Sequence, residues 1–364
     1  GIVCSGGAIL TRLSRYIGGT VFGSILIALL VVVGLDIISV LLDEIGAIQA
    51  SYHFSDVLVY MLTKLPSAIY EFIPFASLIG CLFGLGMLAN NSEVIVMRAA
   101  GVSLLKIVYF VIKPVLLFIV MSTIIGEFFS PYLDQLAEGR RDYLRNGESV
   151  QDSTAGIWAR DGSSFIHINV VFPGGVLFGV SRYQFADDKS LREASFSTRA
   201  TFNAFDGYWV EENVSITRFM DKQTMVDKQL TRRWMSELTP DVLQLNILTP
   251  DALSISSLQR YIEFLEQQNA DVASYELAFW RKVLQPLVIV ALVLIGISFV
   301  FGPLRDSTMG LRVFVGVVLG ISFKILQDML GPFSIVYGFP VFLAVLLPIL
   351  LCAGIGLYLL KRSG

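Results

Sequence analysis

Six apolar runs, each close to or above the length that crosses a bilayer, most constrain what this chain can fold into. A hydrocarbon core of roughly 30 Å needs about 20 helical residues to span it. With 54% hydrophobic and only 16% charged residues, the chain is also more apolar than an ordinary soluble protein. The sequence therefore predicts an α-helical membrane protein with six transmembrane helices. The runs cover residues 17–42, 57–89, 102–129, 283–301, 311–330 and 337–360.

The first run is longer than the apolar core of a secretory signal, which has about 7 to 15 residues. We expect it to be retained as a helix. Pairs of glycines four residues apart would let helices approach closely within the membrane. These pairs are Gly19/Gly23, Gly80/Gly84 and Gly316/Gly320.

A polar segment between the third and fourth runs is long enough to bury a core of its own. Apolar and polar residues alternate there in short stretches, and Asp161-Gly162 is a hairpin-turn dipeptide. These features predict an all-β domain, a sandwich or jellyroll, inserted between helices 3 and 4. Its apolar faces could form a closed core or an open groove for an acyl chain. The expected strands cover residues 156–160, 164–170, 176–185, 194–205, 208–219 and 225–234.

The expected division of the chain follows from this layout. Residues 11–131 form transmembrane helices 1–3, with a short cytoplasmic helix at about 91–101. Residues 132–273 form the β-domain and a connecting amphipathic helix at 254–268, where Leu258, Tyr261, Ile262 and Leu265 have helical spacing. Residues 274–364 form helices 4–6.

Lysine and arginine residues beside the runs predict the orientation of the chain. Cytoplasmic loops carry an excess of these residues, and with six spans one side of the membrane collects most of them. Both termini are therefore expected in the cytoplasm, and the β-domain on the opposite side, where Asp43 and Glu44 follow the first run. Arg281 and Lys282 are exceptions to the pattern. The cytoplasmic set is Arg12, Arg15, Arg98, Lys106, Arg305, Arg312, Lys361 and Arg362.

Common catalytic and metal motifs are missing from the sequence. There is no phosphate loop, dinucleotide fingerprint, zinc-protease motif or nucleophile elbow. The two histidines, His53 and His167, lie far apart, and the three cysteines are not placed to staple the β-domain. With 27 basic and 30 acidic residues and no basic run, nucleic acid is not an expected partner. We expect no catalytic site, metal site or cofactor in this chain.

The charged insert between the second and third runs is the best candidate for a docking site. A carboxylate at the start of a short helix is favourably placed against the helix dipole, and Glu93 and Arg98 would lie on such a helix. In a membrane protein this kind of insert is where another protein docks. The alternative is a solvated loop whose charges only set the topology.

Ionisable residues inside the runs are functional candidates, because burying them in a membrane is costly. For Lys64, Lys113 and Glu127, snorkelling to an interface is an equally good reading. Lys324 and Asp328, four residues apart, could form a structural pair or contact a substrate. The complete set is Asp36, Lys64, Glu71, Lys113, Glu127, Lys324 and Asp328.

Several motifs spread from about Leu13 to the end of the chain support a more specific expectation. They are Arg15-Tyr16-Ile17-Gly18, residues 92–101, Gly126-Glu127-Phe128 with Pro131, Gly156-Ile157-Trp158, residues 250–255, and residues 301–305 with 309–313. Together they resemble the lipopolysaccharide-export permease family of the LptF/LptG type. The last two resemble its LptG branch.

The resemblance implies an ABC-transporter subunit in the Gram-negative inner membrane, with six spans and a periplasmic β-jellyroll. It implies a heterodimer with an LptF-like permease, an LptB-like ATPase dimer that binds ATP and Mg, and an LptC-like bitopic protein leading to a periplasmic bridge. The cargo would be lipopolysaccharide or lipooligosaccharide, extracted from the inner membrane towards the outer membrane.

The resemblance also implies site residues. The insert becomes the coupling helix that meets the ATPase, through Ser92, Glu93, Met97, Arg98 and Gly101. The substrate path or gate would involve Asp36, Asp43, Glu44, Arg281, Lys282, Phe314, Lys324 and Asp328.

One departure from the family concerns the end of the first span. Some relatives carry lysines there that can meet lipid phosphates, whereas an ungapped match places Val40, Gly46 and Ala47 at those positions. The partner subunit, a bridging divalent ion, or Arg281, Lys282 and Lys324 would then supply the cations. Lys324 is the favoured candidate, because the fifth span lines the family's lateral gate.

Two functions from other classes remain open at this stage. A lipid-modifying membrane enzyme could use Asp36, Glu71 or Glu127 as acid or base, although their spacing defines no carboxylate pair. A mechanotransmission or scaffold subunit would share the coupling helix but lack a continuous apolar path for a lipid.

Overall fold

The computed structural model describes residues 3–46, 52–146, 157–172, 175–186, 190–220, 223–236, 238–240, 243, 249–267, 271–304 and 307–363. The chain forms two compact units. The first, called the membrane unit below, holds Gly1–Val40, Leu65–Ser130 and Ser254–Gly364. The second holds Leu41–Lys64 and Pro131–Leu253 and includes the β-domain. Each unit is described by itself below.

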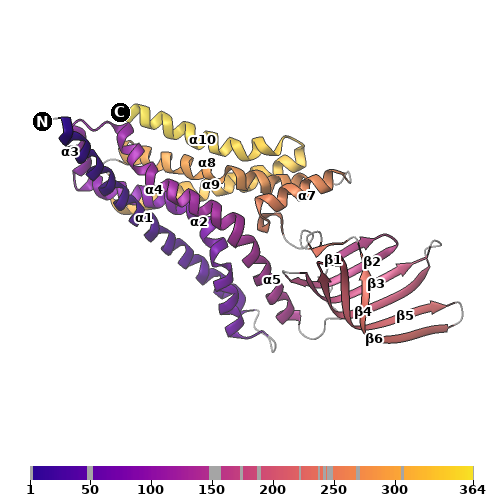
Figure 1. The fold of residues 1–364 in the computed structure, drawn as a ribbon. Coiled ribbons are helices and arrows are strands. Elements are labelled where there is room, and N and C mark those ends of the chain that lie inside the picture. The colour runs from indigo at the N-terminus through magenta and orange to yellow at the C-terminus, as the bar shows by residue number, and fades with distance from the viewer. Residues whose placement is uncertain are drawn as a thin grey trace. The chain divides into compact units, whose positions relative to one another are not determined.

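Six helices of the described chain are long and apolar enough to cross a membrane (Figure 1). Each contains most of one of the six apolar runs, so the expected membrane fold is confirmed, but the third, fourth and fifth spans extend beyond their runs, to Leu104–Arg141, Ala273–Phe301 and Met309–Tyr337. The third span is a composite, in which α4 passes through a π-helical turn, η1, into α5. The elements are α1 (Val3–Ile45), α2 (Phe54–Asn90), α3 (Glu93–Ala99), α4 (Leu104–Ile124), η1 (Ile125–Phe129), α5 (Ser130–Asn146), η2 (Pro250–Ala252), α7 (Ile255–Gln267), α8 (Ala273–Phe301), α9 (Met309–Tyr337) and α10 (Val341–Ser363).

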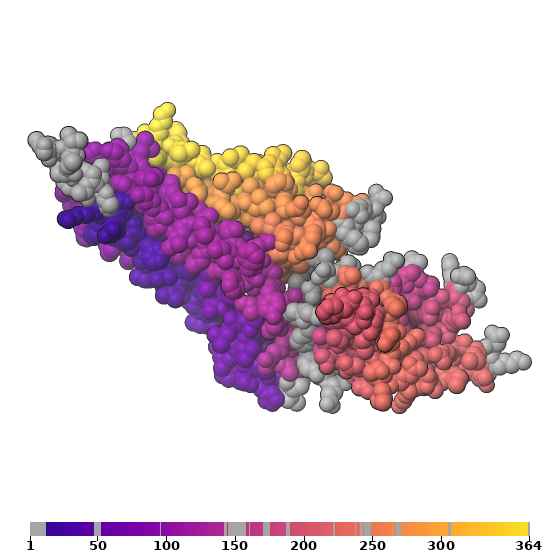
Figure 2. Space-filling view, in the orientation of Figure 1, coloured from indigo at the N-terminus to yellow at the C-terminus, as the bar shows by residue number. Residues whose placement is uncertain are grey.

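Glycines set the closest helix contacts in the membrane unit. A Cβ at Gly80 would overlap the backbone of Ile25, so α1 and α2 touch backbone to backbone there. At Gly356 a Cβ would lie 3.1 Å from the Ile295 nitrogen, and α8 and α10 pack side by side along their length (Figure 2). By contrast, Gly19 and Gly23 have no neighbour within 4 Å of the position of a Cβ.

The β-domain is a six-stranded antiparallel sheet in the order β1-β2-β3-β4-β5-β6, between the third and fourth spans in sequence. The predicted β-domain is therefore confirmed, although Gly156 at its expected start and Gln268 after α7 lie outside the described residues. A separate apolar core includes Ile166, Leu177 and Trp209. The strands are β1 (Ile157–Asp161), β2 (Ser164–Phe172), β3 (Val176–Phe185), β4 (Leu191–Asn203), β5 (Tyr208–Met220) and β6 (Gln223–Met235).

The alternation of buried residues shifts by one position in the middle of the sheet. In β5, Trp209 is buried before the shift, and Val214 and Ile216 are buried after it. Between them Asn213 has a left-handed backbone with φ 52°, and Gly179 in β3 has φ 64°. These irregular residues allow the same face to stay buried on both sides of the shift, because a regular strand would turn its apolar residues outward.

The buried face of the sheet also carries charges. Glu211 is 1% exposed, with the Arg182 guanidinium 3.6 Å away. Glu193 is bonded by Arg232 at 2.8 Å and by Arg218 at 3.2 Å. Burial raises the pKa of Glu211. For Glu193, burial alone would raise the pKa, but the two arginines hold it below its usual value.

Candidate functional site

The charged insert folds as the short helix α3, closed at both ends by unusual backbone. Ser92 precedes it with φ 60°, and Gly101 follows it with φ 85°. The Gly101 amide donates to the Arg98 carbonyl at 3.0 Å, and the Val102 amide donates to the Met97 carbonyl at 3.1 Å. This is a Schellman motif, in which glycine is favoured because its position is left-handed. The sequence therefore fixes where α3 stops.

Helix α3 has one buried face and one exposed face. Val94 and Met97 are buried in the membrane unit's core, whereas Arg98 is exposed and Val96 is 66% exposed. Among the predicted coupling residues, Met97 therefore packs into the core and holds the helix in place, whereas the side chain of Arg98 is exposed. Val96 and Arg98 therefore lie on the exposed face of α3.

Glu93 is held in place from α1. The Tyr16 hydroxyl donates to Glu93 Oε1 at 3.2 Å, and Asn91 Nδ2 donates to the same oxygen at 3.4 Å. The Tyr16 contact joins two of the sequence motifs, residues 15–18 and 92–101, so a shift of α3 would pull on α1. Sequence reasoning missed Tyr16 as a partner, and only its place in a motif pointed to it.

Arg312 is a fully buried cation at the start of α9, with no exposed surface. Its guanidinium donates to the Gly86 carbonyl at 2.7 Å, to Asn90 Oδ1 at 3.1 Å and to the Leu304 carbonyl at 3.2 Å. The first two acceptors, one a backbone carbonyl and the other a side-chain amide oxygen, lie near the end of α2. Sequence reasoning used Arg312 only as a sign of topology and missed this connection.

The charged residues of α9 form a cluster with α2 and α8. Lys324 Nζ lies 2.8 Å from Glu71 Oε1 and 3.8 Å from Asp328 Oδ2. Arg281 is 3.5 Å from Asp328 Oδ1. Lys324 does lie within ion-pair distance of Asp328, which was one of the two alternatives, but Glu71, on a different helix, is the closer partner. Asp36 lies on α1.

The adjacent cations Arg281 and Lys282 point to different neighbours. Arg281 faces α9, where it also donates to the Gln327 carbonyl at 3.4 Å. Lys282 faces α2, with its ammonium 5.5 Å from the centre of the Tyr70 ring. Phe314 is 64% exposed on α9. The structure therefore brings Lys324, Asp328 and Arg281 together and separates Lys282 from that group.

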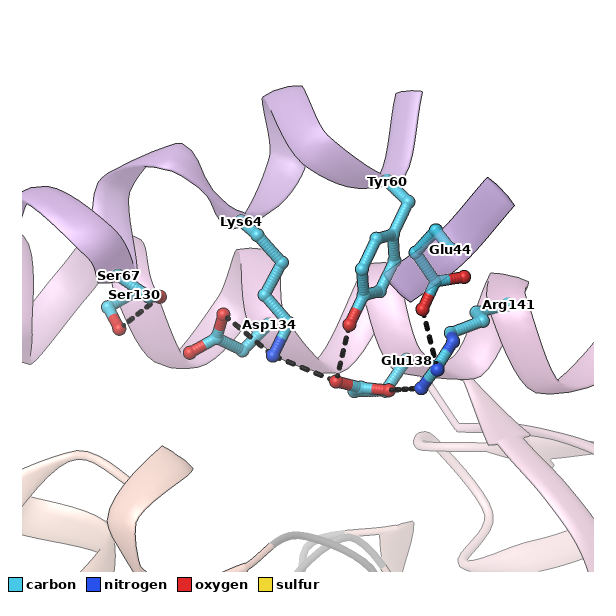
Figure 3. A network of polar contacts seen from close by, with 8 residues as sticks. All are labelled: Glu44, Tyr60, Lys64, Ser67, Ser130, Asp134, Glu138 and Arg141. Carbon is cyan, nitrogen blue, oxygen red and sulfur yellow. Dashed lines mark hydrogen bonds and ion pairs between the residues drawn. The ribbon is translucent and has the colours of Figure 1, made fainter. Parts of the chain in front are cut away.

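Acidic and basic residues from the C-terminal end of α1, the N-terminal part of α2 and helix α5 form a network (Figure 3). Glu44 is 4% exposed and lies 2.6 Å from Arg141. Arg141 also meets Glu138 at 3.3 Å, and Lys64 meets Glu138 at 2.8 Å. Each of these cations is thus already paired within the chain. Asp43 is exposed beside Glu44, and Ala47, one of the three positions without lysine, lies outside the described residues.

The π-helical turn η1 is tied to the start of α7. Both carboxylate oxygens of Glu127 accept backbone hydrogen bonds, from Ile255 at 2.8 Å and Ser256 at 3.3 Å. Two further sequence motifs, Gly126-Glu127-Phe128 and residues 250–255, therefore meet in space. Glu127 caps α7, which the snorkelling interpretation did not anticipate.

Potential metal-ligating side chains do not gather in one place in the part of the chain that the structure describes. No group of three or more His, Cys, Asp or Glu side chains there could hold a metal ion. His167 lies against Trp158, with ring centres 4.8 Å apart, and burial lowers its pKa. The charged groups instead link helices to one another.

Comparison with known proteins gives a consistent result over nearly the whole chain. Residues 15–362 match the family described as lipopolysaccharide export system permease LptF/LptG. The chain is 35% identical over 353 residues to lipopolysaccharide export system permease protein LptG of Escherichia coli (strain K12), covering 96% of this chain and 98% of that protein. It is 33% identical over 355 residues to the protein of the same name from Haemophilus influenzae, covering 97% of this chain and 99% of that protein.

Proposed function

The chain belongs to the lipopolysaccharide export system permease LptF/LptG family, and from this premise we propose how it works as a permease subunit of the Lpt transporter. It is a transporter component rather than an enzyme, and a multi-pass protein of the inner membrane. The observation that carries this function is the family match across all six spans and the β-domain.

We place both termini and α3 in the cytoplasm and the β-domain in the periplasm. The distribution of basic residues supports this orientation, since Arg98 lies in α3, Lys106 lies in the first turn of α4, and Lys361 and Arg362 lie in the last turn of α10. ATP and Mg would be bound by a separate LptB-like ATPase dimer.

In this proposal α3 is the helix on which the ATPase acts. Its exposed Val96 and Arg98 would contact the ATPase, and its buried Val94 and Met97 would carry the movement into the membrane core. Glu93 would pass the same movement to α1 through Tyr16. Ser92 and Gly101 give α3 its fixed ends and so keep it a rigid unit.

The lipid path would involve Asp36 of α1 and Phe314 and Lys324 of α9. An LptF-like permease would form the other side of this path, and an LptC-like protein would receive the lipid for the periplasmic bridge. Exposure of Lys324 at 45% supports a contact with lipid phosphate. Its pairing with Glu71 means that phosphate would compete with a carboxylate of the chain.

The test is reconstitution of the chain with LptF and LptB proteins in liposomes, with ATP turnover measured with and without lipopolysaccharide. We expect a stable complex whose turnover responds to the lipid. Tyr16→Phe should weaken the response without dissolving the complex, because only the hydroxyl that holds Glu93 is lost. Tyr358→Phe, at an exposed tyrosine of α10, is the matched control. A chain that purifies without an ATPase and ignores the lipid would contradict the proposal.

A further inference from the structure

Lys113 places a positive charge inside a membrane-spanning helix. It lies in the third turn of α4, and its side chain is exposed. The ammonium donates a hydrogen bond to Ser14 Oγ of α1 at 3.4 Å and lies 4.9 Å from the centre of the Tyr109 ring. No carboxylate of the described residues lies within ion-pair distance of it. Because a charge within a span is costly unless it is neutralised, an anion from outside the chain would be favourable there.

Helices α1 and α4 pack against each other beside this contact. A Cβ at Gly18 would lie 3.8 Å from both the Phe110 carbonyl oxygen and the Pro114 ring. One turn further along, the rings of Phe22 and Phe118 are 5.2 Å apart. The packing fixes the two helices next to each other, so Ser14 and Lys113 stay together at the edge of a preformed helix pair.

The sequence around this contact carries no negative charge. Residues 1–35 and 94–126 contain neither aspartate nor glutamate. Glu93 is the last acidic residue before α4, and its Oε1 accepts hydrogen bonds from the Tyr16 hydroxyl and from Asn91. The parts of α1 and α4 that meet at Lys113 therefore supply no carboxylate to neutralise it.

Further cations surround Lys113 at this end of the membrane unit. Arg12 and Arg15 of α1 are exposed and lie within one helical turn of Ser14. Lys106 is exposed seven residues before Lys113, on the same face of α4. Basic residues near a membrane surface attract anionic lipids, and basic sites between transmembrane helices bind their headgroups. The charge at this end of α1 and α4 thus favours such a lipid.

The depth of the ammonium matches that of a lipid phosphate. Helix α4 and the turn η1, from Leu104 to Phe129, together rise about 40 Å, which is close to the thickness of a bilayer with its headgroups. Lys113 is about 14 Å from Leu104 along the helix, and its side chain reaches back by one turn to Tyr109. The ammonium therefore lies roughly 8 Å from the start of α4, at the boundary between headgroups and hydrocarbon.

An exposed apolar stripe continues from Lys113 along α4. Its four residues follow Lys113 at the spacing of three and four that keeps side chains on one helix face, and each is between 45% and 57% exposed. A molecule with a negative head and apolar chains would cover both Lys113 and this stripe, whereas a free inorganic anion would leave the stripe bare. The residues, called the α4 stripe below, are Leu116, Leu117, Val120 and Ile124.

We propose that Lys113, Ser14 and Tyr109 bind the phosphate of an anionic bilayer phospholipid, whose chains lie along the α4 stripe. Lys113 supplies the charge, and the two hydroxyls donate hydrogen bonds to phosphate oxygens. The Tyr109 hydroxyl is available for this, because its ring is 60% exposed and the hydroxyl makes no hydrogen bond with the described residues. The binding does not rest on the proposed export function. Only the assignment to the cytoplasmic leaflet follows from the orientation proposed above.

The experiment is native mass spectrometry of the purified full chain in detergent. Dioleoylphosphatidylglycerol and dioleoylphosphatidylcholine are added separately, because they share their acyl chains and their phosphate but only the first carries a net negative charge. We expect phosphatidylglycerol to bind about fivefold more tightly than phosphatidylcholine. ATP turnover plays no part in this measurement, so its result is independent of the transport assay.

Variants locate the binding. Lys113→Gln should weaken phosphatidylglycerol binding about tenfold, as expected for loss of one charge-assisted hydrogen bond, whereas Lys113→Arg keeps the charge and should stay within about twofold. Tyr109→Phe should weaken binding about threefold, because one hydrogen bond is lost. Lys361→Gln, at an exposed lysine in the last turn of α10, is the matched control and should stay within about twofold, since a distant charge acts only through a screened field.

The proposal is overturned by any of three results. These are equal binding of the two lipids, equal losses in Lys113→Gln and Lys361→Gln, and a loss in Lys113→Arg as large as that in Lys113→Gln. Size-exclusion profiles and circular dichroism of each variant establish that it is folded before binding is compared.

Discussion

At the scale of single residues, Arg312 joins three segments that have different tasks. Its hydrogen bonds reach Gly86 and Asn90 near the end of α2, the Leu304 carbonyl after α8, and the Met309 sulfur of its own helix α9. The last turn of α2 leads directly into α3. Since hydrogen bonds to a charged group contribute about 1.5–3 kcal/mol each, this side chain makes the end of α2 and the start of α9 move together.

Two substitutions test this connection from opposite sides. Gly86→Ala would place a Cβ 2.7 Å from Arg312 Nη1, and Arg312→Lys keeps the charge but cannot reach all three acceptors. Both should lower lipid-stimulated ATP turnover about tenfold in the reconstituted complex while basal turnover changes little, because the link from α3 to α9 is cut. Gly310→Ala, with no neighbour within 4 Å of the new Cβ, is the control. Equal effects of all three would contradict the connection.

The pair of Lys324 and Glu71 gives a second prediction for single residues. Glu71→Gln should raise the affinity of the complex for lipopolysaccharide about fivefold, because a partly exposed ion pair contributes up to about 1 kcal/mol and phosphate would no longer compete with it. Lys324→Gln should lower the affinity. The measurement is a binding titration with labelled lipid, and a weaker affinity in Glu71→Gln would show that the carboxylate does not compete.

Sequence reasoning found the ionisable residues at this scale but not their partners. A structural pair of Lys324 and Asp328 was one of two alternatives, because residues four apart lie on one face of a helix. Glu71 lies far from Lys324 in sequence, and so does Tyr16 from Glu93. Such contacts depend on how helices rotate and slide against each other, which the pattern within one helix does not determine.

At the scale of elements, the link between η1 and α7 should decide how firmly α7 is held. Glu127→Gln keeps the size of the side chain but removes its negative charge and one of the two oxygens that accept hydrogen bonds from the α7 amides. We expect faster hydrogen exchange at the start of α7, by about fivefold, as for loss of about 1 kcal/mol of capping energy. Glu263→Gln within α7 is the control. Unchanged exchange in Glu127→Gln would remove Glu127 as the cap.

The elements themselves were largely predictable. The six runs became six helices, and the six expected strands became six strands, because the apolar periods differ between the two classes. The π-helical turn and the shift at Asn213 were not predictable. Each changes the register by one residue, and ordinary residues at Ile125–Phe129 give no local signal of it.

At the scale of the whole molecule, the two units have separate apolar cores. Three of the chain's four tryptophans, Trp158, Trp209 and Trp234, lie in the sheet. Tryptophan fluorescence therefore reports mainly on the β-domain, whereas circular dichroism reports mainly on the membrane helices. We expect urea to unfold the sheet, in detergent, before the helices lose structure.

Lowering the pH should destabilise the β-domain, measured as its urea unfolding by tryptophan fluorescence. Burial opposes ionisation of Glu193, but Arg232 and Arg218 hold its folded pKa below the usual 4.5. Its stabilising contribution is therefore present above about pH 4.5 and is lost as the pH falls below that value. Glu193→Gln should lose less stability than the wild-type chain between about pH 5 and about pH 3. Equal losses would assign the acid sensitivity to other groups.

The contact between Gly86 and Arg312 also has a consequence for the history of the family. A chain that acquires a larger residue at position 86 leaves no room for the guanidinium, and a chain that loses the guanidinium removes the donor to the Gly86 carbonyl and to Asn90 Oδ1. A substitution at either position alone should therefore destabilise the protein. Among diverging relatives, the two positions should therefore change together, as a coupled pair separated by most of the chain.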